Sequence, residues 1–90
     1  MPQIGKKYFV IAHAYHHYIC EVTDITPKFL ITKDCIKIMS DSAGWEATLL
    51  DGLDPKKTSW QCMPDGTELP YGSLPIIPWN HPIPKRKKIT

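Results

Sequence analysis

The sequence has no long apolar run, no Cys-x-x-Cys pair and no strong excess of one charge. Without an apolar run long enough to cross a bilayer, and without a signal peptide, we expect neither a membrane span nor secretion. The cysteines are an odd number and widely spaced, so we expect reduced thiols packed as small hydrophobic side chains in a cytosolic setting. These cysteines are Cys20, Cys35 and Cys62.

The small net charge of +2 hides an uneven distribution along the chain. Residues 1–84 contain seven basic and nine acidic residues and so carry −2, while four of the eleven basic residues lie in one run near the C-terminus. A body with that balance is not a basic platform for nucleic acid, and attraction to phosphate would belong to the run. We expect one β-rich domain over residues 1–84 and a basic tail over residues 85–90.

Residues 34–53 change their hydrophobic period in the middle, from an alternating strand to a helical stripe. The stripe consists of Trp45, Leu49 and Leu53. Asp41 or Ser42 is expected to cap the start of this helix, and Gly52 is expected to end it. A helix of about ten residues is not stable alone in water, so it must pack on a sheet.

Short runs of aromatic and β-branched residues, separated by turn residues, predict that sheet. The first two runs form a hairpin, a break at Lys33 or Asp34 separates the third from the fourth, and Pro75 and Pro78 restrict the last to a sheet edge. The fold class is therefore mainly β with one short α-helix, as a small antiparallel SH3-like barrel or a curled sheet. The expected strands lie within residues 6–14, 16–24, 28–32, 35–39, 58–63 and 71–79.

Three segments occur in an order that resembles a known family. They are YICEVTDITP from Tyr18, DCIKIMSDSAGWEATLLDGL from Asp34 and PWNHPIP from Pro78. They resemble a family of unknown function that is encoded by tailed bacteriophages and prophages, with a Gly-Glu-Val strand, an Asp-Ser/Thr-Gly-like block and a closing Pro-Trp-x-His-Pro-x-Pro. The resemblance covers residues 16–84, although Cys20 stands where a glycine is commoner and residues 38–40 match loosely. It implies a phage source and supplies no catalytic residues.

Four possible metal ligands lie close together in the sequence, namely His13, His16, His17 and Cys20. They lack the paired, closely spaced ligands of structural zinc sites, and on a strand His17 and Cys20 point to opposite faces. We therefore expect no metal, no cofactor and histidines that decorate a hairpin tip. No cysteine has a neighbour that would activate its thiolate, so we also expect no catalytic site. Asp41, Asp51 and Asp54 occupy positions typical of a helix cap, a helix end and a turn. We therefore do not expect them to act as catalytic acids or bases.

The three tryptophans are expected in two different environments. Trp45 and Trp60 are expected in the core, whereas Trp79, among prolines in a polyproline-like run, is expected to face a partner. Deleting residues 80–90 is then expected to leave the fold intact and to weaken association. The expected partner-binding residues are Trp79, His81, Ile83, Lys85, Arg86, Lys87 and Lys88.

These patterns predict a non-enzymatic structural or interaction protein of a phage, in the virion or in the host cytoplasm. It would dock on a larger phage or host protein by a sheet edge and the extended C-terminal arm. The alternative is a small intracellular effector that binds and inhibits a host protein, for example one of a defence system. A homo-oligomer or assembly subunit is compatible with either function, nucleic acid would be met only through the tail, and an enzyme is the least favoured class.

Overall fold

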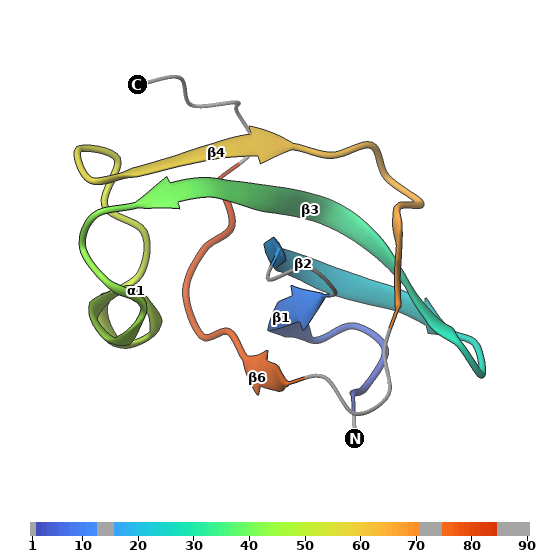
Figure 1. Ribbon diagram of the computed structural model, residues 1–90. Coiled ribbons are helices and arrows are strands. Elements are labelled where there is room, and N and C mark those ends of the chain that lie inside the picture. Colours follow the sequence, from blue (N-terminus) through green and yellow to red (C-terminus); the bar gives the residue numbers. More distant parts are fainter. Residues whose placement is uncertain (1, 13–15, 71–74, 85–90) are drawn as a thin grey trace.

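The computed structural model describes residues 2–12, 16–70 and 75–84. They form a curled antiparallel sheet in the order β4-β3-β2-β1-β6, with β5 paired beside it on β3 (Figure 1). Within these ranges β4 and β6 do not pair, so the sheet is open rather than a closed barrel. The prediction of a mainly β fold with one short helix is confirmed. Its elements are β1 (Lys7–Ala12), β2 (His16–Ile25), β3 (Phe29–Asp41), α1 (Trp45–Asp51), β4 (Thr58–Cys62), β5 (Glu68–Pro70) and β6 (Ile76–Pro78).

The predicted hairpin is the pair β1–β2, in register from Lys7 opposite Glu21 to Ala12 opposite His16. Its turn, residues 13–15, lies outside the described residues. Successive side chains of a strand point to opposite faces, and three successive residues of β1 are all buried. Both faces of β1 therefore contribute to the core. These residues are Tyr8, Phe9 and Val10.

β3 is one strand of thirteen residues, so the expected break at Lys33 or Asp34 is wrong. The register against β2 slips by one residue near Asp34, which has a φ of 52°. One extra residue in one strand is a β-bulge, and aspartate is among the side chains that tolerate positive φ. The bulge bends β3 without ending it, so its first half pairs with β5 and its second half with β4.

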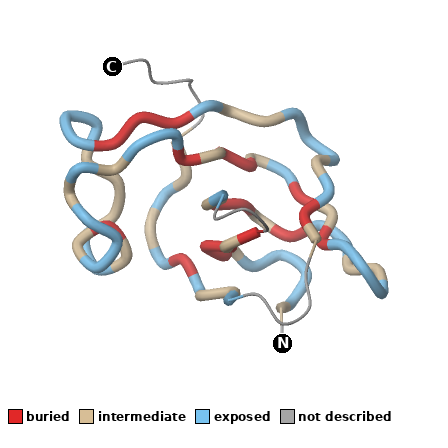
Figure 2. The backbone as a smooth tube through the Cα atoms, in the orientation of Figure 1, coloured by how far each residue is buried: buried red, intermediate tan, exposed pale blue. Residues whose placement is uncertain are grey.

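The sheet separates two small cores, and the buried residues lie mainly along strands β1 to β4 (Figure 2). The first core lies on the face toward β5, and the second lies on the face toward α1. The buried side chains of the first core are Tyr8, Val10, Cys20, Val22, Leu30, Cys35 and Leu69. Those of the second core are Phe9, Ile19, Ile36, Ile38, Trp60 and Trp79.

Helix α1 packs on the second core, but its start differs from the expected cap. Its N-cap is Gly44, and no side chain caps it. Asp41 instead accepts hydrogen bonds from the hydroxyls of two buried threonines, Thr48 in the helix and Thr58 in β4. Buried hydroxyls need such partners, so the carboxylate joins the helix to the sheet. The helix ends as expected at Gly52, where φ is 87°.

The segment after β6 crosses the second core, and we name residues 79–84 the C-terminal strap. It runs from β6 past α1 toward β4, on the side of the sheet that carries the helix (Figure 1). The amide of Trp79 donates to the Lys7 carbonyl at 3.0 Å, and the Lys7 ammonium donates to the His81 carbonyl at 2.7 Å. The strap is therefore fixed to β1 at two points.

The remaining strands agree in part with those expected from the sequence. β4 confirms the expected strand over residues 58–63, and β6 is an edge strand that ends at Pro78, as the prolines predicted. β5 was not foreseen, because three residues ending in Pro70 give too short a pattern. In the part of the chain that the structure describes, no helix has the length and apolarity needed to cross a membrane.

Candidate functional site

Trp79 is inside the protein, with 2% of its surface exposed. Its ring stacks on Phe9 with ring centres 6.3 Å apart and planes 24° apart, and its Nε1 donates to the Pro82 carbonyl at 3.5 Å. The expectation that Trp79 faces a partner is therefore wrong. The prolines around it keep the strap extended, and this allows the indole to reach the second core.

The other predicted binding residues of the strap also contact the body. The imidazole of His81 lies edge-on to Trp79 at 5.0 Å, and its Nε2 is 3.1 Å from the Leu49 carbonyl of α1. Ile83 is half-buried against the second core. Partner binding by the predicted set stays a prediction. Its remaining members, Lys85, Arg86, Lys87 and Lys88, lie outside the described residues.

Trp45 is the exposed tryptophan, at 37%, so its expected place in the core is wrong, whereas Trp60 is buried as expected at 5%. Trp45 is the first residue of α1, and the side of the helix that packs inward is centred on Thr48 because Asp41 holds that hydroxyl. The helix therefore presents Leu49 to the second core and leaves Trp45 at its border.

Trp45 is nevertheless held firmly in place. Its indole stacks on the imidazole of His17 from β2, with ring centres 4.0 Å apart and planes 15° apart. Both rings contact buried Phe9, the indole edge-on at 5.5 Å and the imidazole at 5.6 Å. Stacked and edge-to-face aromatic pairs of this kind are favourable contacts. We name the pair His17 and Trp45 the aromatic shelf.

A hollow of about 390 Å³ lies beside the aromatic shelf. Met39, an apolar side chain 55% exposed, is part of its wall. The charged or titratable side chains that line it are all basic, and no carboxylate is among them. The hollow therefore combines apolar surface with one ammonium group, that of Lys37, and the imidazoles of His16 and His17. Its lining residues are His16, His17, Lys37, Ile38, Met39, Ser40 and Trp45.

The sequence patterns did not predict the aromatic shelf, since they placed His17 on a hairpin tip and Trp45 in the core. The two residues lie on different elements, and they meet because the register of β2 on β3 sets His17 opposite Ile38. The sequence carried one relevant signal: Met39 occupies a position of β3 next to buried Ile38, where alternation predicts an outward side chain.

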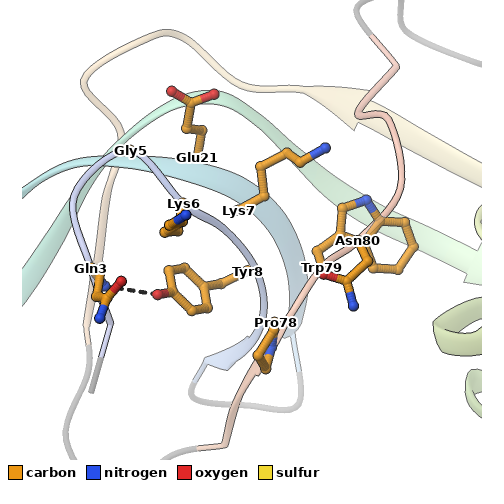
Figure 3. A pocket seen from close by; sticks show the side chains of 9 residues that line it. All are labelled: Gln3, Gly5, Lys6, Lys7, Tyr8, Glu21, Pro78, Trp79 and Asn80. Atoms are coloured by element: carbon orange, nitrogen blue, oxygen red, sulfur yellow. Dashed lines mark hydrogen bonds between the residues drawn. The ribbon is translucent and has the colours of Figure 1, made fainter.

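A larger hollow of about 550 Å³ lies where the strap leaves β6 (Figure 3). The Tyr8 hydroxyl at its inner side accepts a hydrogen bond from the backbone amide of Gln3 at 2.8 Å. Two of its charged groups, those of Lys7 and Glu21, have partners: Lys7 donates to the strap, and Glu21 is 3.4 Å from Lys33. The third charged residue of the lining is Lys6. Mixed and engaged charges do not select one class of ligand, so we regard this hollow as the joint between strap and sheet.

The residues considered for metal binding do not form a metal site within the described ranges, whereas the expected lack of a catalytic site stays a prediction. Those ranges contain no group of three or more His, Cys, Asp and Glu side chains placed to hold a metal ion. His13 lies outside the described residues, and the absence of zinc stays a prediction. Cys20 and Cys35 are free, buried thiols, and Cys62 is a free thiol that is half-buried.

Comparisons with protein-family models, with curated proteins and with solved structures each give no match. The resemblance to the phage family therefore rests on the sequence segments alone. The arrangement of side chains has to support any statement about function.

Proposed function

We propose that this chain is a non-enzymatic phage protein that docks on a larger protein through the aromatic shelf. The observation that carries the proposal is Trp45, which stays 37% exposed although His17 and Phe9 hold its ring in place. Tryptophan is enriched among the residues that dominate binding energy at protein interfaces. A ring that is already fixed loses little conformational entropy when it binds.

The chemistry around the shelf favours an acidic partner segment with an apolar side chain. The apolar group would enter the hollow between Trp45 and Met39, and carboxylates would lie near Lys37 and His16. Opposite charges at the border of an interface steer association and select partners. The body of residues 1–84 carries −2, so a hollow lined by Lys37 and no carboxylate is a local feature.

The β6 edge of the sheet contributes less to the proposed docking than the shelf does. β6 has three residues, and its last one, Pro78, has no amide hydrogen to donate to an added strand. The basic residues 85–88 would add attraction to an acidic surface that decreases with salt.

The phage context of this proposal comes from the resemblance of residues 16–84 to the phage family. Within that context we favour a component of the virion. The alternative, an effector that binds and inhibits a host protein, would use the same shelf, so the two differ in where the chain is found.

The test is incorporation of tagged chain into phage particles during infection of the host. Met39→Glu places an acid beside the shelf, and Leu50→Glu is its matched control, since Leu50 is an equally apolar and 72% exposed residue on α1. We expect Met39→Glu to reduce incorporation by about tenfold, which corresponds to a loss of about 1.4 kcal/mol, and Leu50→Glu to change little. Circular dichroism of both variants establishes that they are folded.

Three other outcomes are informative. Equal incorporation of both variants and the unmodified chain would remove the shelf from the proposal. Absence from the particles, together with a host protein that binds the unmodified chain but not Met39→Glu, would favour the effector. Absence from the particles and no binding that depends on Met39 would overturn both.

A further inference from the structure

We propose that Cys20 and Cys35 are an oxidation site, at which a hydroperoxide converts the two thiols into a disulfide that links β2 to β3. This proposal is independent of the docking function, since it concerns the interior of the isolated chain.

The strand register places the two cysteines across from each other on β2 and β3, at the bulge. On β2 and β3 the partners are His17 and Ile38, then Tyr18 and Lys37, then Ile19 and Ile36. One further step in the same register sets Cys20 opposite Cys35. The register shifts between Ile19 and Glu21, so the two residues Cys35 and Asp34 of β3 lie across from Cys20, and Asp34 is the one with positive φ.

Backbone hydrogen bonds identify the type of cross-strand pair. The Cys35 carbonyl accepts a hydrogen bond from the Met63 amide at 2.8 Å, so the N–H and C=O groups of Cys35 point toward β4 and away from β2. The Val22 amide donates to the Lys6 carbonyl at 2.9 Å, so the N–H and C=O groups of Val22 point toward β1. Cys20 lies two residues earlier on β2, so its N–H and C=O groups point toward β1 as well. The cysteines are therefore a non-hydrogen-bonded pair, whose Cα atoms lie about 4.5 Å apart in antiparallel sheets. This separation is within the range of about 4.4–6.8 Å that disulfides span.

The side chains also meet. The Cys35 Sγ lies 4.0 Å from the Ile36 carbonyl, to which it donates. Cys20 and Cys35 are both completely buried in the first core, and a hydrogen bond between their side chains is the largest influence on the pKa of each. This hydrogen bond lowers the pKa of Cys35 and, together with burial, raises the pKa of Cys20. Cys35 is therefore the first of the pair to ionise and the first to react. Cys62 lies toward the second core, on the other face of the sheet.

The reaction needs one molecule of hydroperoxide, for example hydrogen peroxide. The Cys35 thiolate attacks one peroxide oxygen, the O–O bond breaks, and the products are a sulfenic acid and hydroxide, which takes up the proton that Cys35 released. The sulfur of Cys20 then attacks the sulfenic sulfur and displaces its hydroxyl group, which leaves as water with the proton of Cys20. Two thiols lose two electrons, and the peroxide is reduced to two molecules of water.

A route for a small oxidant exists beside Cys35. A hollow of about 160 Å³ opens next to this part of β3, and Cys35, Met63 and the half-buried Cys62 contribute to its wall. Cys62 is therefore the competing thiol that the experiment has to distinguish. Hydrogen peroxide is close to water in size, so local opening at the bulge is sufficient for entry. Larger reagents are excluded from a thiol that is buried to this degree.

The test treats the folded chain with hydrogen peroxide and then counts and maps the thiols in denaturant. We expect the loss of two thiols and of the mass of two hydrogen atoms, with Cys62 still free and Cys20 joined to Cys35. The rate should rise with pH as the Cys35 thiolate forms. The bridge closes the loop between the two cysteines, so we expect the melting midpoint to rise by about 10 °C and to return after reduction.

The matched variants are Cys62→Ala, which keeps the pair, and Cys20→Ala, which removes it. Cys62→Ala should still lose two thiols and Cys20→Ala should form no intramolecular bridge. If Cys20→Ala fails to fold, mapping of the unmodified chain decides alone. A bridge that contains Cys62, oxidation of Cys62 only, or three thiols left intact under conditions that oxidise the unfolded chain would each overturn the proposal.

Discussion

At the scale of single residues, Trp79 is a side chain that the fold needs more than Trp45. Trp79 is 2% exposed and Trp45 is 37% exposed. We expect Trp79→Ala to lower the free energy of unfolding by about 3–5 kcal/mol, as truncation of a fully buried aromatic does. Trp45→Ala should cost about 1–2 kcal/mol, because part of its surface already contacts water.

Urea denaturation followed by circular dichroism measures both variants under the same conditions. Trp45→Ala is the control for loss of an indole as such. Equal effects would show that the strap does not seat Trp79 in the second core. If Trp79→Ala does not fold at all, Trp79→Phe keeps an aromatic ring and gives a measurable, smaller loss.

The burial of these two residues was beyond what the sequence could predict. The four-residue spacing of Trp45, Leu49 and Leu53 correctly indicates a helix, but it does not fix how the helix rotates on the sheet. That rotation depends on the hydrogen bond between Asp41 and Thr48, two residues on different elements. Likewise, prolines around Trp79 predict extended chain and do not say whether that chain lies outside or crosses a core.

At the scale of elements, the end of α1 and the strap depend on each other through Gly52. A Cβ atom at Gly52 would lie 3.3 Å from the His81 ring, whereas one at Gly44 would meet nothing within 4 Å. Both glycines have similar positive φ, 87° and 92°, so alanine is strained at both positions. We expect Gly52→Ala to cost about 1 kcal/mol more than Gly44→Ala, because it also displaces His81.

Thermal and urea unfolding of the two variants give this difference, and Gly44→Ala accounts for the shared backbone strain. If the His81 ring moved away without cost, Gly52→Ala and Gly44→Ala would lower the free energy of unfolding by the same amount. In that case His81 would not be holding the strap against α1.

Element type and order could be predicted from the sequence much better than element junctions. Alternation and turn residues indicated the hairpin, the strand that carries Trp60 and the proline-limited edge strand. The continuous β3 could not be foreseen, because Asp34 reads as a strand breaker unless the partner strand that accommodates its bulge is known. The aromatic shelf could not be foreseen either, because His17 and Trp45 meet only through the packing of α1 on β2.

At the scale of the whole molecule, the strap replaces the strand pairing that would close a barrel. The sheet order leaves β4 and β6 at opposite ends, and the strap crosses the second core between them (Figure 1). A small chain buries a limited fraction of its surface, so a segment that covers one of two cores is a large part of its stability. The expectation that residues 80–90 are dispensable for folding conflicts with this arrangement.

We therefore predict that the fold depends on residues 81–84. A chain that ends at Pro84 keeps His81 on the Leu49 carbonyl and Ile83 on the second core, whereas a chain that ends at Asn80 loses both. Ile83 is half-buried, so its burial contributes about half of the roughly 1.5–3 kcal/mol of a fully buried Ile side chain, and the two lost hydrogen bonds of His81 add about 1 kcal/mol each. The shorter chain should thus be about 3 kcal/mol less stable, which lowers the melting midpoint by about 10–20 °C in a domain of this size.

Circular dichroism melts of the two truncated chains and the full chain measure this directly, and the chain ending at Pro84 separates the strap from the basic run after it. Equal midpoints for the two truncations would restore residues 79–84 as a free arm that a partner could bind. A loss that already appears at Pro84 would move the domain boundary beyond residue 84. Only instability confined to the shorter chain fits a strap that holds α1 on the sheet.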